Sequence, residues 1–178
     1  MYMDPLFFQM PEGIDKEKYV IATYLIGVER EVEALKYVAA LAVEQTTGTW
    51  TNVPGETPEV RERHLGRLVG LYEVPPYPLA YPKDIEERYF IARIAFPADN
   101  FGPSFSMLLT TIFGNISTID RIKLMDVEFP DSYLKHFKGP KFGVEGLREL
   151  LGVHDRPLVN NMIKPCIGLN PEQTAELA

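Results

Sequence analysis

The sequence predicts an α+β domain built on one antiparallel sheet, with two helices covering one of its faces. Segments rich in β-branched and aromatic residues, which favour strands, alternate with segments that carry apolar residues at helical spacings. Their order along the chain is strand, helix, strand, strand, helix, strand. This order is the split βαβ pattern of a ferredoxin-like fold.

Four segments are predicted as strands because each is short, rich in apolar residues and bounded by glycine, proline or charged residues. They are residues 18–27 (KYVIATYLIG), 66–74 (GRLVGLYEV), 88–97 (RYFIARIAFP) and 120–130 (DRIKLMDVEFP). The proline-rich PPYPLAYPKD between the second and third strands predicts a loop.

Two helices are predicted between these strands. From Glu31, EVEALKYVAALAVEQ places apolar residues such as Leu35 and Val38 on one stripe of an amphipathic helix. PSFSMLLTTIFG, residues 103–114, opens with proline and closes with Gly114, which predicts a second helix. After the sheet, PDSYLKHF and VEGLRELLG predict two short helices in a linker.

The end of the chain predicts a new strand–helix unit. RPLVNNMIKPCIGL is an apolar strand, and NPEQTAELA begins a helix with Asn170 as its N-cap and Pro171 as its first residue. A lone unit of this kind cannot bury both faces of its strand, so we expect the chain to be part of a longer protein. The expected organisation is an N-terminal extension (1–17), the α+β domain (18–130), a helical linker (131–157) and the strand–helix unit (158–178).

Composition limits the classes of function. The 178 residues are 46% hydrophobic, enough for one core. The formal charge of −7, without a basic block, argues against nucleic acid and anionic membranes as partners. The single cysteine cannot form an internal disulfide, and neither a signal peptide nor a membrane-spanning stretch is present in the sequence. We therefore expect a cytoplasmic protein.

MIKPCIGLNP carries one candidate site. Lys164 and Cys166 are two residues apart, so in a strand they point to the same face near its carboxyl end, where α/β folds gather active sites. A lysine buried in an apolar strand needs an anion or acts as a base with a shifted pKa. An edge lysine that reaches solvent explains the spacing equally well. Cys166 is expected to be a small core residue.

The segment VEQTTGTWTNVPG gathers hydroxyls, a glycine and the only tryptophan after the first helix. Such a loop could contact a phosphate or oxyanion, and Glu44 could orient a lysine or a bound water. The alternative is a helix C-cap with Gly48 in the left-handed conformation and Trp50 in the core. Asn115, after Gly114, could likewise be a helix cap. The three histidines show no metal-ligand spacing.

Several motifs together resemble one family. EQTTGTWT, FGNI, LMDVEFPDSYLKHFKGPKFGVEGLRELLGVHDRPL and IKPCIGLNPEQTAELA are similar, in order and spacing, to the large subunit of ribulose-bisphosphate carboxylase (RuBisCO) and its RuBisCO-like relatives. The resemblance covers the chain from about residue 18. It implies a ferredoxin-like domain followed by the truncated start of a (β/α)8 barrel, and a homodimer whose sites join the N-terminal domain of one subunit to the barrel of the other.

The resemblance also implies roles for particular residues. Glu44 would be the acid that reaches the partner's site, Thr49 and Trp50 would contact a substrate phosphate, and Asn115 would lie beside metal and substrate. Lys164 matches the lysine that handles protons during enolisation. Mg²⁺ is the implied cofactor of the full-length protein, with ligands outside this chain.

Two departures from the family patterns limit the activities that we expect. The carboxylases carry Lys-Pro-Lys where this chain has Lys-Pro-Cys, so a cation is absent at Cys166, where carboxylation builds negative charge. The related enolases of methionine salvage carry a lysine base where this chain has Asn115. We therefore expect a protein that enolises, isomerises or decarboxylates a phosphorylated sugar ketone without fixing CO2. The alternatives are genuine carboxylase activity and a non-catalytic binding or assembly module. The 178 residues alone are expected to be inactive.

Overall fold

The computed structural model describes residues 13–49, 53–74, 86–119, 121–160, 168 and 170–177. The chain divides into two compact units, Met1–Phe137 and Lys138–Ala178. The boundary between them falls inside the segment predicted to be a helical linker.

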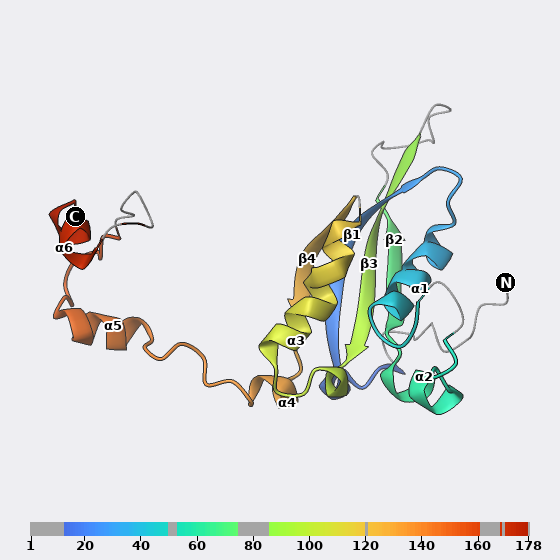
Figure 1. Cartoon of the computed structure of the whole chain (residues 1–178), viewed down its shortest axis with the longest axis horizontal. Helices are drawn as coiled ribbons and strands as arrows, with labels where there is room; N and C mark the ends of the chain where they lie inside the picture. The colour runs from blue at the N-terminus through green and yellow to red at the C-terminus, as the bar shows by residue number, and fades with distance from the viewer. Residues whose placement is uncertain are drawn as a thin grey trace. The chain divides into compact units, whose positions relative to one another are not determined.

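The first unit is built on a four-stranded sheet with the strand order β2-β3-β1-β4, and each neighbouring pair is antiparallel (Figure 1). The strands are β1 (Tyr19–Glu29), β2 (Arg67–Glu73), β3 (Glu87–Pro97) and β4 (Ile122–Glu128). Each lies within a residue or two of a predicted strand. The predicted α+β class with one antiparallel sheet is confirmed.

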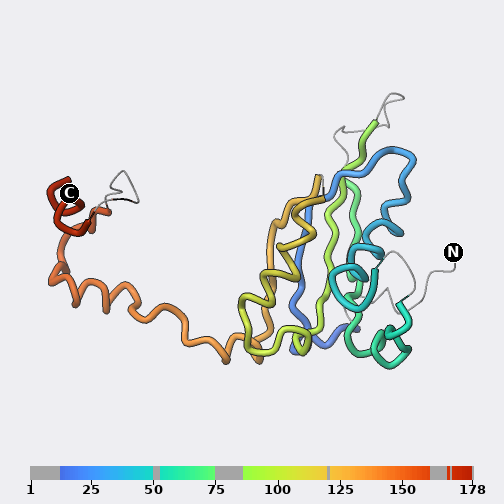
Figure 2. Tube along the Cα trace, viewed as in Figure 1, coloured from blue at the N-terminus to red at the C-terminus, as the bar shows by residue number. Residues whose placement is uncertain are grey.

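Helical segments precede, connect and follow the strands. They are η3 (Lys16–Lys18), α1 (Ala34–Glu44), α2 (Pro58–His64), η4 (Ala98–Asn100), α3 (Phe105–Leu109), η5 (Thr110–Gly114), η6 (Asn115–Thr118) and α4 (Asp131–Leu134). The predicted second helix is therefore an α-helix that widens into a π-helical turn, η5, and is followed by the 3-10 turn η6. Figure 2 shows the chain leaving β3, passing through these turns and returning as β4.

Helix α2 was not predicted. Its seven residues are mostly charged or polar and none is buried, so they carry no apolar stripe. It forms because Thr57 accepts a hydrogen bond from the Val60 N–H at 3.3 Å and Pro58 occupies the first turn.

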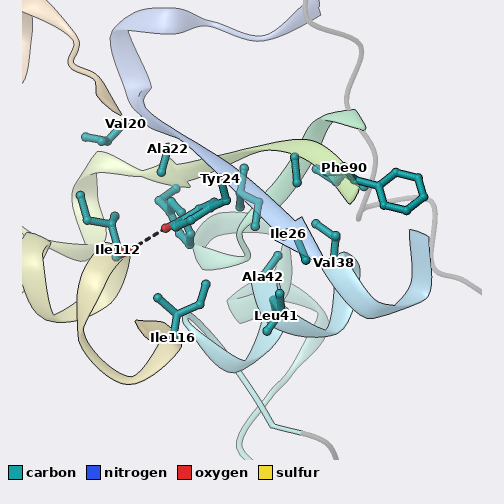
Figure 3. Packing of buried hydrophobic residues seen from close by; sticks show 14 of the residues in the cluster. Val20, Ala22, Tyr24, Ile26, Val38, Leu41, Ala42, Phe90, Ile112 and Ile116 are labelled. Carbon is teal, nitrogen blue, oxygen red and sulfur yellow. Dashed lines mark hydrogen bonds between the residues drawn. The ribbon is translucent and has the colours of Figure 1, made fainter. Parts of the chain in front are cut away.

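The main core lies on one face of the sheet. The even-numbered residues of β1, from Val20 to Val28, are at most 4% exposed, as the two-residue period of a strand requires. Helix α1 packs on this face, and so does the segment from α3 to η6, as Figures 1 and 3 show. The helical side chains in this core include Val38, Leu41, Ala42, Leu108, Ile112 and Ile116. Burial of each large aliphatic side chain favours folding by about 1.5–3 kcal/mol.

The second unit contains α5 (Val144–Leu151) and α6 (Pro171–Glu176). The predicted N-cap of α6 is confirmed: Asn170 Oδ1 accepts from the Gln173 N–H at 2.8 Å, and Gln173 Oε1 accepts from the Asn170 N–H at 3.0 Å. The strand predicted before it falls mainly on residues 161–167, which lie outside the described residues together with Lys164 and Cys166.

Candidate functional site

The predicted site residues are only partly within the described residues. Glu44, Thr49 and Asn115 are included, whereas Trp50 and Lys164 are not. The described residues place two candidate regions on the first unit: the turn that follows α1, with Glu44 and Thr49, and the turn that follows η5, with Asn115.

Glu44 and Thr49 contact each other. Glu44 is the last residue of α1 and is half-buried, and its Oε2 accepts a hydrogen bond from the exposed Thr49 hydroxyl at 2.6 Å. The helix ends here because the next residues turn back on it: the Gly48 N–H donates to the Val43 carbonyl at 3.2 Å. The acid and the hydroxyl, predicted as parts of one loop, therefore lie at one place on the surface.

Glu56 is the centre of a polar cluster under this turn. Its side chain is only 9% exposed, and its Oε1 accepts from the Thr47 hydroxyl at 2.6 Å and from Arg61 Nη1 at 2.7 Å. Arg61 is on α2, so the unpredicted helix supplies the cation that balances this largely buried carboxylate. We call Thr47, Gly48, Glu56 and Arg61 the Glu56 cluster.

Gly48 belongs to this cluster because its backbone lies close to the Glu56 carboxylate. Its φ is not positive, so the expected left-handed cap is wrong. A Cβ at this position would lie 2.8 Å from Glu56 Oε2. The carboxylate is held by Thr47 and Arg61 and cannot move away freely, so a side chain at residue 48 would displace the turn that carries Thr49.

Thr46 fixes the turn to the sheet. Its hydroxyl donates to the Ala42 carbonyl at 2.6 Å and accepts from the Gly66 N–H at 3.1 Å, directly before β2. The turn is thus joined both to α1, which precedes it, and to the strand that follows α2.

Asn115 lies at the junction of η5 and η6. It is exposed, and its carbonyl accepts a hydrogen bond from the Thr118 hydroxyl at 2.7 Å. Three residues earlier, the Ile112 carbonyl accepts from the Tyr24 hydroxyl at 2.7 Å, a contact drawn in Figure 3. Within the described residues, no hydrogen bond joins Asn115 to Glu44 or Thr49.

Sequence reasoning missed Tyr24, Glu56 and Arg61. Tyr24 is the only even-numbered residue of β1 between Val20 and Val28 that has a polar side-chain atom, and such an atom needs a partner when buried. That signal indicates that Tyr24 has an acceptor without indicating which residue provides it. Glu56 and Arg61 give no comparable signal, because charged residues beside a helix start are common.

The described residues do not supply a metal site. No group of three or more His, Cys, Asp or Glu side chains among them is arranged to hold an ion. None of the helices in this described part is long and apolar enough to cross a membrane.

Comparison with known proteins identifies the family. Residues 8–133 match ribulose bisphosphate carboxylase large chain, N-terminal domain. A RuBisCO-like protein from Archaeoglobus fulgidus is 50% identical over 169 residues, which is 95% of this chain and 39% of the relative. A 2,3-diketo-5-methylthiopentyl-1-phosphate enolase from Geobacillus thermodenitrificans is 38% identical over 84% of this chain and 36% of its own length.

A solved structure of a related protein supports the same family. The crystal structure of a rubisco-like protein (MtnW) from Alicyclobacillus acidocaldarius has a TM-score of 0.64 and 34% identity, covering 89% of this chain and 38% of that one. The chain spans about two fifths of the length of these relatives. Since the family match extends over most of the chain, it belongs to the ribulose bisphosphate carboxylase large-chain family, as a RuBisCO-like N-terminal domain.

Proposed function

We propose that the full-length protein enolises, isomerises or decarboxylates a phosphorylated sugar ketone and does not fix CO2. The observation that carries the proposal is the 50% identity to a RuBisCO-like protein over 95% of this chain. The enolase relative supports the substrate class, because its printed name describes a diketone that carries a phosphate.

Glu44 and Thr49 have the chemistry for one edge of such a site. Thr49 donates its only hydroxyl proton to Glu44. A lysine that paired with Glu44 would compete for that carboxylate and leave the Thr49 hydroxyl able to donate to a phosphate oxygen instead. Glu44 then orients a cation while Thr49 holds the phosphate.

Lys164 is the proposed proton-handling residue. A lysine at the carboxyl end of a barrel strand can take the proton next to the ketone when its pKa is lowered by burial. Cys166 replaces the cation that a carboxylase would carry, and a neutral thiol cannot stabilise the negative charge of carboxylation. Enolisation without CO2 fixation follows.

Mg²⁺ is the proposed cofactor of the full-length protein, where it would polarise the ketone carbonyl. The described residues do not fit it, because no suitable group of ligands occurs among them. We propose that its ligands come from barrel strands outside this chain, as the family resemblance implies, and that Glu44, Thr49 and Asn115 act on the substrate side.

The finer architecture belongs to the same proposal. The strand order β2-β3-β1-β4 with helices on one face is consistent with a ferredoxin-like domain over 18–130. We propose that 131–157 link this domain to a (β/α)8 barrel that begins within 158–178. The proposed assembly is a cytoplasmic homodimer, in which exposed Thr49 and Asn115 of one subunit complete the site on the partner's barrel.

The test uses the full-length protein with two phosphorylated ketones as probes, ribulose 1,5-bisphosphate and 2,3-diketo-5-methylthiopentyl 1-phosphate. Exchange of the proton beside the carbonyl is followed in D2O by NMR, and CO2 incorporation is followed with labelled bicarbonate. We expect exchange or an isomerised product on at least one probe, without fixed carbon.

Lys164→Met should abolish that exchange, and the control Lys141→Met, at an exposed residue of the second unit, should not change it. Normal exchange in Lys164→Met would refute the role of this lysine. Incorporation of labelled CO2 would favour the carboxylase instead.

A further inference from the structure

The helical segment that ends at Asn115 has an unusual construction. Residues Thr110–Gly114 form a π-helical turn between an α-helix and a 3-10 turn. A π-turn is less favourable than α-helix and occurs often at functional sites. The chain therefore changes its helical register twice within a few residues of Asn115, and each register sets a different direction for that side chain.

Side chains stabilise the start of this turn. The Thr110 hydroxyl donates to the Ser106 carbonyl at 2.9 Å, and the Thr111 hydroxyl donates to the Met107 carbonyl at 3.1 Å. Hydroxyls that bond to the carbonyl four residues earlier bend helices. These contacts favour the departure from α-helix, but they lie on the exposed side and do not fix the turn relative to the sheet.

Tyr24 makes the contact that does so. It is 0% exposed on β1, one of the two inner strands, and its hydroxyl donates to the Ile112 carbonyl at 2.7 Å, in the middle of the π-turn. The Ile112 carbonyl therefore has a donor from outside its own helical segment. Burial raises the pKa of Tyr24 above its ordinary value, and the hydroxyl therefore remains a proton donor at any physiological pH.

Packing alone would not select this register. Leu108, Ile112 and Ile116, at most 1% exposed, form an apolar stripe at four-residue spacing. Such a stripe can remain packed after a shift of the backbone between helical registers, as long as apolar side chains of similar volume still contact the sheet. A hydrogen bond to one carbonyl does not tolerate it, because its geometry is narrow.

We propose that Tyr24 is a positioning residue for the active site: its hydrogen bond to Ile112 fixes the register of the π-turn and thereby the position of Asn115. The inference rests on the proposed function only in that Asn115 touches the substrate. Tyr24 itself lies in the core and does not contact the substrate.

The experiment compares Tyr24→Phe with the control Tyr133→Phe in the full-length protein. Each change removes one hydroxyl and keeps the ring. The Tyr133 hydroxyl donates to the Ser104 carbonyl at 3.2 Å, at the opposite end of the same helical segment. The first measurement is amide hydrogen exchange over residues 110–118, which needs no substrate. We expect exchange about tenfold faster in Tyr24→Phe and little changed in Tyr133→Phe.

The second measurement is turnover on the phosphorylated ketone that proves active, alone and in an Asn115→Ala background. Tyr24→Phe should lower kcat about tenfold or more and change KM less, since a small misplacement of a catalytic contact is costly. In the Asn115→Ala background it should have no further effect, because the two changes act through the same side chain. A structural role alone would lower turnover equally in both backgrounds.

Each outcome separates the inference from the proposed function. Unchanged amide exchange in Tyr24→Phe, or equal losses of turnover in both backgrounds, would overturn the role of Tyr24. If Asn115→Ala kept full turnover, the assignment of Asn115 would fail, and the amide exchange alone would decide whether Tyr24 sets the register.

Discussion

The turn after α1 and the turn after η5 both present a candidate site residue to solvent, but they are held in different ways. The first is fixed by polar side chains close in sequence, gathered around Glu56. The second is fixed by apolar burial and by one hydrogen bond from Tyr24, 88 residues away from Ile112. The stability of the first should therefore respond to changes of charge and hydrogen bonding, and that of the second to changes of volume as well as to loss of the Tyr24 hydroxyl.

The largest effect is expected in the second region. Ile112→Ala removes a side chain that is 1% exposed, and we expect a loss of about 2–5 kcal/mol in the free energy of unfolding, measured by urea denaturation. The control Leu109→Ala, at a residue 41% exposed on the same segment, should cost less than about 1 kcal/mol. Similar losses for the two variants would mean that burial does not hold this segment.

Gly48→Ala tests the close approach in the first region. The new Cβ would meet the Glu56 carboxylate at 2.8 Å, and we expect a loss of about 1–3 kcal/mol in the free energy of unfolding. Gly55→Ala is the matched control, because a Cβ there meets nothing within 4 Å, and it should change stability by less than about 0.5 kcal/mol. If both substitutions were neutral, the turn would not depend on this contact.

Glu56→Gln tests the charge of the cluster with little change of volume. The glutamine amide keeps one acceptor, but Arg61 loses its ionic partner. The free energy of unfolding, measured by urea denaturation, should therefore fall by an amount on the order of 1–2 kcal/mol. Glu62→Gln, at an exposed residue of α2, serves as the control and should stay within about 0.5 kcal/mol of the parent. Equal losses of stability for the two variants would mean that the charge of Glu56 does not hold this turn.

The helix caps should give the smallest and most equal effects. Thr57 caps α2 in the first region and Ser104 caps α3 in the second, each through a hydrogen bond to an N–H three residues later. Substitution of either by alanine should cost about 1 kcal/mol in thermal or urea unfolding. A clear difference between the two losses would show that one cap stabilises more of the fold than its own helix.

The strands and the two main helices were predictable because burial imposes a period on the sequence. The alternation in β1 and the stripe of α1 reflect one shared core, so the residues that face it can be recognised without knowing their partners. Helix α2 was missed for the same reason, since it buries no residue. The end of the second helix at Gly114 was predicted, but its π-turn was not, because threonine and isoleucine are equally compatible with other helical forms.

The site was predictable only where its residues are neighbours in sequence. Glu44 and Thr49 were expected in one loop and do contact each other. The expected left-handed conformation of Gly48 was wrong. The Glu56 carboxylate, eight residues later in the sequence, shapes the turn, and the conformation of the glycine does not. The bond from Tyr24 to Ile112 joins distant segments, and no local pattern specifies it.

We propose that Glu44 of one subunit and Lys164 of its partner meet in one active site. This central claim is tested most directly by co-expressing full-length Glu44→Gln and Lys164→Met chains in equal amounts and measuring turnover of the purified mixture, which contains both homodimers and the hybrid. Each variant alone should be nearly inactive, and random assembly into dimers should restore about a quarter of the parent activity, because one of the two sites in each hybrid is intact. A hybrid mixture no more active than either variant alone would contradict the claim.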